Sequence, residues 1–435
     1  MNSEILIPLP YTKSNAKMAV LIRNIKSLIQ VDRKEKAFLA GDEMKDIPTI
    51  DNAWLLLDNE RIHSYGSMEK FPETEQFDNL ETVDASGCLV MPAFCDSHTH
   101  LVFPNTREVE YVDKINGLSY EEIAERGGGI LNSAKAIQEA SEDKLFEDAM
   151  QRLDLITGYG TGAVEIKSGY GLTTESELKM LRVIKRLKQN SPLTIKSNFL
   201  GAHSIPMEFR GQQEKYVDIV VNEMLPAVAE ENLADFVDVF CDKGFFTVED
   251  TERILEKAAE YGIRPKIHAN ELDYSGGIQV GVKYNALSVD HLEFTGEEEM
   301  KVLKGSGTMP TILPGAAFFL GMKYAPAKEM MAYGLPVAMA SDFNPGSSPS
   351  GNMQLILSMA SILYRMTPQE AINATTLNTA YALGVENELG SIDKGKIANI
   401  IITKPINGIE YLPYAYGDNK VWKVYIKGKP AKENQ

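Results

Sequence analysis

Apolar runs alternate with amphipathic stretches through the middle of the chain. Eight runs stand out: LVMPAFCDSHTH, TGAVEIKSGYG, TIKSNFLGAHS, FVDVFCDKG, RPKIHANEL, LSVDHLEF, TMPTILPG and PVAMASDFN. Strands that are apolar along nearly their whole length are typical of parallel sheets buried on both faces. Alternation of such strands with helices predicts an α/β protein. Eight units predict a TIM (β/α)8 barrel, and a doubly wound open sheet is the alternative architecture.

Capping sequences mark where several of the intervening helices begin. Ser119–Glu122, Thr174–Glu177 and Thr367–Glu370 each place a hydroxyl three residues before a carboxylate, which is the pattern of a capping box. Pro368 follows Thr367 at the first helical position, where proline is favoured. These signals predict the start of a helix at three places between the apolar runs.

The first 90 and the last 50 residues have a different pattern from the centre. Ala19–Val31 and Ala53–Gly66 are strand-like, and the second segment predicts a hairpin around Asp58 and Asn59. GSIDKGKIANIIITK and KVWKVYIKGK, near the C-terminus, also predict strands and turns. We therefore predict a small β-sandwich domain made from both chain termini, residues 1–90 and 386–435, beside a barrel of residues 91–385.

Composition and charge limit the partners of such a protein. The 435 residues are 44% hydrophobic and 24% charged, which is ample for a large core. The net charge of −17 argues against nucleic acid and against an anionic membrane surface, whereas a small anionic substrate would need a local cationic group. Three cysteines, an odd number, argue against a disulfide framework. With no apolar run of transmembrane length and no signal-peptide core, we expect a cytoplasmic protein.

The histidines are distributed unevenly along the chain. His63 lies in the N-terminal hairpin, but the other five lie at or just beyond the C-terminal end of an apolar run, and so does Asp342; the five are His98, His100, His203, His268 and His291. In a parallel barrel these strand ends meet at one rim, where active sites of this fold lie. His98 and His100 are two positions apart and so face the same side of a strand. The alternatives are hydrogen-bonded core histidines and a helix N-cap at Asp342.

These residue types suit a hydrolytic metal site. Three neutral imidazoles and one carboxylate leave one coordination position of a divalent metal open, and water bound there becomes nucleophilic near neutral pH. Asp342 can take the proton from that water and pass it to a leaving nitrogen. His291 can polarise the carbonyl group under attack. The sequence therefore predicts a metal-dependent hydrolase.

Longer stretches of the chain resemble a known enzyme family. LVMPAFCDSHTHLVF resembles the opening strand of the amidohydrolase superfamily, and GSIDKGKIANIIITK resembles its return into the small β domain. More narrowly, the chain resembles the imidazolonepropionase family, which opens 4-imidazolone-5-propanoate to N-formimidoyl-L-glutamate in histidine degradation. The matching stretches cover roughly residues 88–400, and the most specific are VEIKSGYGL and DFNPGSSP.

The resemblance implies a role for each candidate site residue. It implies one metal ion, zinc or iron, bound by His98, His100, His268 and Asp342. It implies a catalytic role for His291, beside Asp342 and Glu271. Contacts to the substrate are implied for Arg107, Tyr170, His203, Glu271, Asn344, Gly346 and Ser347. A homodimer is compatible with the resemblance, although no residue pattern requires one.

Elementary chemistry supports several of these implied contacts. Arg107 can bind the propanoate carboxylate in bidentate fashion. This contact would offset the electrostatic repulsion of an anionic substrate that is expected from an acidic protein. Tyr170 and Ser347 offer hydroxyl groups, Gly346 allows close approach of the backbone, and Glu271 can bind a ring N–H or relay protons. The alternatives are a surface salt bridge for Arg107, a packing role for Tyr170 and a solvated loop charge at Glu271.

The chain departs from the family pattern in three places. Pro104 and Asn105 stand where a glycine is common before the arginine, and Ser347 stands where threonine is usual. Lys243 ends the fourth strand, where an acidic residue is expected; in dinuclear amidohydrolases a modified lysine there bridges two metals. Two other functions stay open at this point. They are a related deaminase acting on a ring C–N bond and a non-enzymatic barrel used as a scaffold.

Overall fold

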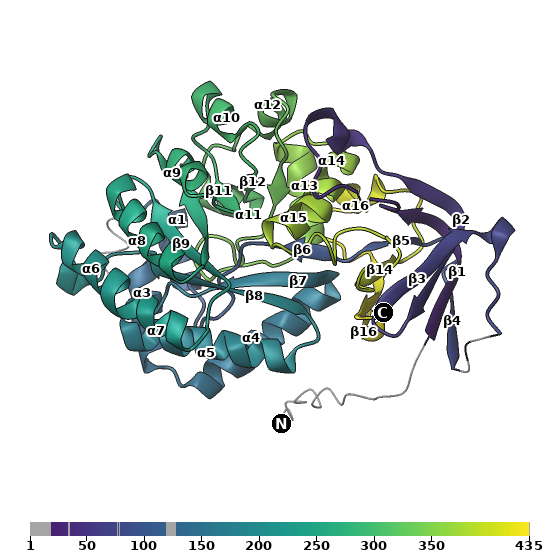
Figure 1. Cartoon of the computed structure of the whole chain (residues 1–435), viewed down its shortest axis with the longest axis horizontal. Helices are drawn as coiled ribbons and strands as arrows, with labels where there is room; N and C mark the ends of the chain where they lie inside the picture. Colours follow the sequence, from purple (N-terminus) through teal and green to yellow (C-terminus); the bar gives the residue numbers. More distant parts are fainter. Residues whose placement is uncertain (1–18, 34, 76, 78, 119–127, 435) are drawn as a thin grey trace.

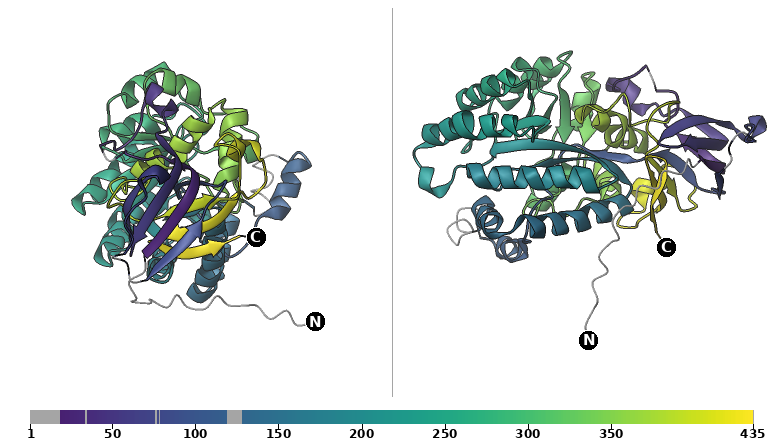
Figure 2. Two further views of the ribbon diagram at one scale, coloured as in Figure 1. Left: turned by 90° about the vertical axis from the view of Figure 1, so that its right-hand side faces the viewer. Right: turned by 60° about the horizontal axis from the view of Figure 1, so that its bottom comes forward.

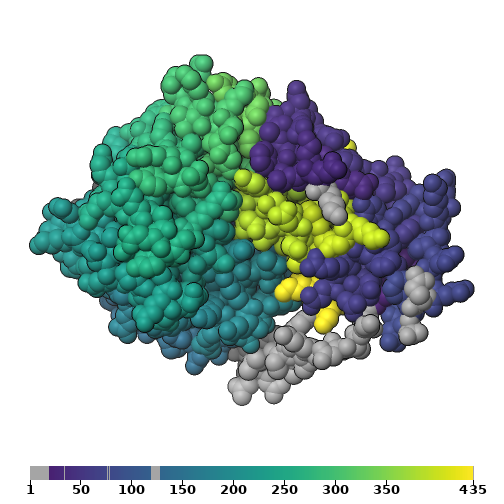
Figure 3. Space-filling model, viewed as in Figure 1, coloured from purple at the N-terminus to yellow at the C-terminus, as the bar shows by residue number. Residues whose placement is uncertain are grey.

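The computed structural model describes residues 19–33, 35–75, 77, 79–118 and 128–434. A β/α barrel forms one end of the molecule and a mixed β-sheet forms the other (Figure 1). Strands and helices from the middle of the chain build the barrel. The N-terminal and C-terminal segments lie side by side at the opposite end (Figure 3).

Eight parallel strands make up the barrel sheet, in the order in which they occur in the chain. They are β6 (Phe94–Asp96), β7 (Thr161–Lys167), β8 (Thr194–Ala202), β9 (Phe236–Cys241), β10 (Arg264–Ala269), β11 (Ser288–His291), β12 (Met309–Ile312) and β13 (Ala338–Met339). Each of the eight apolar runs contributes one of these strands. Every residue of β7 and β9 is buried, as expected for strands covered on both faces.

Backbone hydrogen bonds just beyond β6 and β13 join the two ends of this sheet. The amide of Asp342 donates to the carbonyl of His98 at 3.0 Å, and the amide of His100 donates to the carbonyl of Phe343 at 2.9 Å. Thr99 and Phe343 form a parallel bridge between the same segments. The predicted barrel is confirmed, and its closure lies among the candidate site residues.

Helices cover the outside of the barrel (Figure 2). α4 packs against β7, α5 against β8 and α8 against β9 and β10. The helices are α1 (Glu108–Ile115), α3 (Ile130–Glu139), α4 (Glu142–Gly158), α5 (Thr174–Asn190), α6 (Gln213–Ile219), α7 (Leu225–Glu230), α8 (Val248–Glu260), α9 (Gly277–Lys283), α10 (Glu297–Leu303), α11 (Pro314–Leu320), α12 (Ala327–Ala332), α13 (Met353–Leu363), α14 (Pro368–Thr375), α15 (Leu377–Ala382) and α16 (Tyr411–Tyr414). A π-helical turn, η4 (Val220–Met224), joins α6 to α7, and short 3-10 turns are η1 (Gly41–Lys45), η2 (Met68–Lys70) and η3 (Met207–Phe209).

The three predicted helix starts have different outcomes. The capping box of Thr367 and Glu370 is present, and Pro368 follows it in the first turn of α14. The prediction for α5 is wrong by one residue, because Thr173 caps the helix by accepting from the amide of Ser176. Glu177 points instead at the loop after β7. The segment Ser119–Glu122 lies outside the described residues.

The terminal strands form one mixed sheet, in the order β16-β15-β14-β5-β1-β2-β3 with β4 also beside β1. They are β1 (Ala19–Ile29), β2 (Thr49–Asp58), β3 (Arg61–Ser67), β4 (Leu80–Asp84), β5 (Leu89–Pro92), β14 (Ile400–Thr403), β15 (Val421–Ile426) and β16 (Lys429–Glu433). The predicted hairpin is confirmed, since β2 and β3 pair across Asn59.

A bend in β1 gives this sheet its sandwich-like packing. Asn24 has a φ of 56°, and the register with β2 shifts between Ile22 and Ile25. β4 pairs with the first half of β1 and β5 with the second half. Apolar side chains of both halves share one core, which includes Ile22 and Ile400.

The predicted domain limits, residues 1–90 with 386–435 and residues 91–385, stay a prediction. Across the described part of the chain, no helix has the length and apolar character needed to span a membrane.

Candidate metal centre

Five histidines and Asp342 come together at the carboxyl ends of the barrel strands. His98 and His100 follow β6, His203 follows β8, His268 and His291 lie at the ends of β10 and β11, and Asp342 follows β13. All six side chains are buried. Three sets of their donor atoms each lie within 4.8 Å of one another: His98–His268–His291, His100–His203–His268 and His98–His100–Asp342. His63 lies apart, in β3 of the terminal sheet.

Hydrogen bonds orient two of the imidazoles towards a common point. Nδ1 of His98 donates to Asp290 Oδ2 at 2.6 Å, and Nδ1 of His268 donates to Asp238 Oδ1 at 3.0 Å. The Nε2 atoms of both rings are buried and have no hydrogen-bond partner among the described residues. Buried polar atoms without a partner are costly, and a carboxylate behind each histidine is the usual arrangement at metal sites. The donor set therefore fits a bound metal ion.

Asp342 completes a tetrad of donors around this point. Its Oδ1 atom lies 3.6 Å from Nε2 of both His98 and His100. The residue has a φ of 52°, in the left-handed region, which aims its side chain at the histidines while its amide closes the barrel. It is not the N-cap of a described helix, so that alternative is wrong.

Burial keeps the imidazoles in the form that binds metals. It lowers the pKa of His98, His100 and His291 well below the usual range, and neighbouring positive charges act in the same direction. Burial also lowers the pKa of His203 to about 3. Neutral imidazole is the ligand form. Burial raises the pKa of Asp342 to about 7, and a cation beside its oxygens would favour the charged carboxylate.

A fully buried set of charges lies behind the histidines, inside the barrel. Lys167 Nζ contacts Glu165 at 2.5 Å and Asp238 at 2.6 Å, while Lys266 contacts Glu165 and donates to the carbonyl of Ser97 at 2.6 Å. We call Glu165, Lys167, Asp238, Lys266 and Asp290 the barrel-floor network. Burial alone would lower the pKa of Lys167, but the nearby carboxylates raise it above its ordinary value. Sequence reasoning missed this network, although lysines inside the apolar runs VEIK and RPKIH were a signal.

Arg107 lies against the loop that follows β13. A Cβ atom added to Gly346 would lie 2.2 Å from Nη1 and 2.4 Å from Cζ of Arg107, so the guanidinium needs the glycine. The Arg107 side chain is only 12% exposed. Its Nε atom pairs with Glu110 at 2.8 Å. Because the guanidinium is also packed on the loop after β13, the alternative of a simple surface salt bridge does not account for its position.

The loop after β13 also brings together the remaining residues predicted there. Nδ2 of Asn344 donates to the carbonyl of Asp342 and to Ser347 Oγ, both at 2.7 Å. Ser347 Oγ in turn donates to Asp342 Oδ2 at 3.3 Å. Asn344 and Ser347 therefore support Asp342 directly, in addition to any contact with a ligand.

Tyr170 lies beside the histidines rather than in a remote core. Its ring centroid is 5.5 Å from that of His100 and 5.3 Å from that of His203. Nδ1 of His203 donates to the carbonyl of Gly169 at 3.0 Å, which ties the same loop to β8. Glu177 fixes the loop from α5, where its buried carboxylate accepts from the amides of Gly169, Gly171 and Leu172. This role of Glu177 was not predicted.

Glu271 is buried beside His291, so the alternative of a solvated loop charge is wrong. Its Oε2 atom lies 3.6 Å from Nδ1 of His291. Burial, and then the charges of Asp342 and Asp242, raise the pKa of Glu271 to about 8. Asp242 also accepts from the Glu271 amide at 2.7 Å, which fixes the backbone of this loop. Glu293, which sequence reasoning missed, lies 4.0 Å from Nδ1 of His291 and is also buried.

Lys243 does not take part in this site. Its side chain is 76% exposed and pairs with Asp273 at 2.8 Å. The interpretation of Lys243 as a lysine that bridges two metals is therefore wrong.

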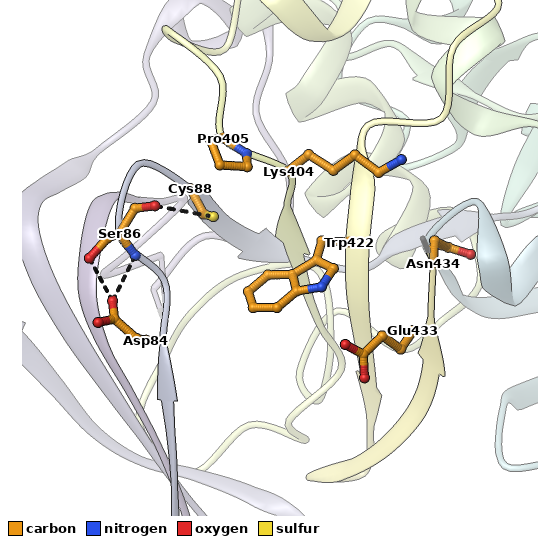
Figure 4. A pocket seen from close by; sticks show the side chains of 8 residues that line it. All are labelled: Asp84, Ser86, Cys88, Lys404, Pro405, Trp422, Glu433 and Asn434. Atoms are coloured by element: carbon orange, nitrogen blue, oxygen red, sulfur yellow. Dashed lines mark hydrogen bonds between the residues drawn. The ribbon is translucent and has the colours of Figure 1, made fainter.

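A separate cavity of about 680 Å³ lies in the terminal sheet (Figure 4). Its walls come from β4, β15 and β16 and from the segments that follow β4 and β14, with Trp422 between Asp84 and Glu433. None of the predicted site residues lines it. The cavity is therefore distinct from the histidine cluster at the barrel rim.

A parallel barrel with neutral imidazoles and an aspartate at the carboxyl ends of its strands defines the class of the metal-dependent barrel hydrolases. Comparison with known proteins agrees. The amidohydrolase family model matches residues 89–431. The imidazolonepropionases of Christiangramia forsetii and Flavobacterium johnsoniae are each 52% identical to this chain over 412 residues, 95% of this chain and 100% of each relative. The chain belongs to the amidohydrolase family and, within it, to the imidazolonepropionases.

Solved structures confirm the fold at much lower identity. Atrazine chlorohydrolase TrzN from Arthrobacter aurescens TC1, complexed with zinc, is 16% identical and has a TM-score of 0.69, with 95% of each chain covered. The predictions of the superfamily, of the barrel and of a hydrolytic enzyme are therefore confirmed.

Proposed function

We propose that this chain hydrolyses the cyclic amide C–N bond of 4-imidazolone-5-propanoate, with water, to give N-formimidoyl-L-glutamate. The observation that carries the substrate assignment is the guanidinium of Arg107, seated on Gly346 at the rim that holds the histidines. The chain has a net charge of −17, which repels a carboxylate substrate. A shielded cation at this place would attract the carboxylate locally. A neutral nucleobase, the substrate type of the rival deaminase, gives no reason for it.

The metal is proposed to bind to His98, His100, His268 and Asp342, as one zinc or iron ion. The unpartnered Nε2 atoms of His98 and His268 and the Oδ1 atom of Asp342 between His98 and His100 support this choice. When bound, the metal would activate a water molecule and polarise the substrate carbonyl. Three imidazoles and a carboxylate suit both metals, so elemental analysis of the purified protein decides between them.

The chain's own residues then move the protons. Asp342 is proposed to take a proton from the attacking water at a carboxylate oxygen and to return it to the leaving ring nitrogen. His291, whose ring centroid lies 5.3 Å from that of His268, is proposed to polarise the carbonyl oxygen from the other side. Glu271, next to His291, is proposed to bind a ring N–H or to relay the proton.

Substrate contacts complete the proposal. The Nη edge of Arg107 binds the propanoate carboxylate, and Tyr170, His203, Asn344, Gly346 and Ser347 surround the rest of the substrate.

Location in the cytoplasm is also a proposal, and three free, buried cysteines support it. The homodimer stays a prediction.

Turnover of the authentic substrate tests the proposed activity. Freshly prepared imidazolone propanoate is expected to lose its ultraviolet absorbance when metal-loaded protein is added, and a chelator is expected to stop the reaction. A protein that carries its full complement of metal and still leaves the absorbance unchanged would contradict the assignment. A stable protein that binds no metal would favour the scaffold instead.

Arg107→Ala tests the carboxylate contact separately from the chemistry. We expect KM for imidazolone propanoate to rise by about 10- to 100-fold, because charged hydrogen bonds contribute about 1.5–3 kcal/mol. Metal content should not change, since Arg107 is not among the proposed ligands. Arg210→Ala, which removes an exposed arginine, is the matched control. An unchanged KM in Arg107→Ala would defeat the carboxylate role.

A further inference from the structure

We propose that Glu110 is a positioning residue for the substrate carboxylate, acting through Arg107. By holding the Nε side of the guanidinium, Glu110 turns the Nη edge towards the barrel rim. This inference rests on the proposed binding of the propanoate by Arg107, and it adds a residue for which neither the sequence motifs nor the family resemblance suggested a role.

The first support is the division of the guanidinium into two edges. Oε2 of Glu110 accepts from Nε of Arg107 at 2.8 Å. Among the described residues, no hydrogen-bond partner contacts Nη1 or Nη2, and both atoms lie over Gly346. A carboxylate bound in bidentate fashion needs two parallel donors in one plane. With Nε already engaged, the Nη1–Nη2 edge is the pair that stays available to a ligand.

The second support is the way in which Glu110 is itself anchored. The amide of Gly129 donates to Oε2 at 3.0 Å, and Nδ2 of Asn132 donates to Oε1 at 3.0 Å. Gly129 has a φ of 80°, a conformation that favours glycine, and it is the N-cap of α3. The carboxylate of Glu110 thus accepts three hydrogen bonds and joins Arg107 to the start of a second helix. Its side chain is only 14% exposed.

The third support is the weak attachment of α1 to the core. Arg107 is the N-cap residue of α1, yet none of the eight residues of α1 is buried. Further along the helix, Tyr111 stacks on Phe319, at 5.1 Å between centroids, and Lys114 donates a hydrogen bond to the Phe319 carbonyl at 3.3 Å. Glu110 therefore ties the end of α1 from which Arg107 projects to the start of α3.

Charge alone would predict the opposite effect from positioning. A carboxylate beside Arg107 offsets part of the arginine's attraction for an anion, so removal of Glu110 would improve binding if long-range charge dominated. If orientation dominates, removal weakens binding, because displacement of a binding group by about 1 Å can cost up to about 100-fold. The direction of the change in KM therefore separates the two effects.

The test compares Glu110→Ala and Glu110→Gln with wild type on two substrates. They are imidazolone propanoate and its neutral analogue, in which a primary amide replaces the carboxylate. For the acid, we expect Glu110→Ala to raise KM about 10-fold with kcat nearly unchanged. Glu110→Gln should have a smaller effect, since its amide oxygen can still accept from Nε. For the neutral analogue, kcat/KM should not change. Glu108→Ala, which removes an exposed glutamate two residues before Glu110 on α1, is the matched control.

A double variant distinguishes positioning from a structural role. Glu110→Ala is expected to add nothing to KM once Arg107→Ala is present, because it acts only through the arginine. Additive effects in the double variant, equal losses on both substrates, or a lower KM in Glu110→Ala would each overturn the inference. If Arg107→Ala raises KM and Glu110→Ala does not, only this inference fails. If neither variant changes KM, the proposed carboxylate contact fails with it.

Discussion

Exchange of His268 for alanine is expected to empty the metal centre and to lower kcat about a thousand-fold or more. His268 belongs to two of the three donor sets at the rim, as do His98 and His100, and its Nδ1 already donates to Asp238. Its loss removes one of the proposed ligands and one of the donors that converge at the rim. A thousand-fold loss corresponds to about 4 kcal/mol in the activation barrier, within what an activated water contributes.

Metal analysis and kinetics on the same sample check this result. His63→Ala is the matched control, because His63 lies in the terminal sheet, where its ring contacts Ser64 and Phe77. It should leave the metal content and kcat at the wild-type level. A His268→Ala protein that retains both full metal and full kcat would show that the proposed ligand set is wrong. Retention of metal with loss of kcat would indicate that His203 or His291, which belong to the other donor sets, is a ligand in place of His268.

The barrel was predictable because each strand is buried on both faces. Burial on both faces requires an apolar residue at nearly every position, and this pattern can be recognised without knowledge of the fold. The rim was predictable for a related reason, since parallel strands bring all their carboxyl ends to one side. Five of the six histidines at such ends are enough to locate the site, although not to assign each ligand.

Other parts of the site could not be predicted because their partners are distant in sequence. Glu177 is placed in a helix start by its spacing, but its carboxylate accepts from a loop in front of that helix. In the sequence, Glu110 is one of several polar residues on an exposed helix. Its role becomes visible only in the folded structure, where Gly129 and Asn132 donate hydrogen bonds to it. The barrel-floor network joins charges from four strands, and each of them alone looks like an interruption of an apolar run.

Lys167→Met is expected to be the most destabilising single change inside the barrel. Lys167 is fully buried and lies between Glu165 and Asp238, so its loss leaves two carboxylates close together without this cation. Breaking a buried ion pair by removal of one partner costs about 3–5 kcal/mol. Asp238 also orients His268, so we expect metal affinity to fall about 10- to 100-fold, as for other residues that support ligands.

Chemical denaturation, and competition for the metal with a chelator, measure the two effects separately. Lys185→Met, which removes an exposed lysine on α5, is the control for the substitution itself. Glu165→Gln added to Lys167→Met should restore part of the stability, because it neutralises one of the carboxylates left behind, while Lys266 keeps its bond to Ser97. Restoration of stability without restoration of metal affinity would assign the metal effect to Asp238 alone. A Lys167→Met protein as stable as wild type would mean that the barrel-floor network contributes nothing to folding.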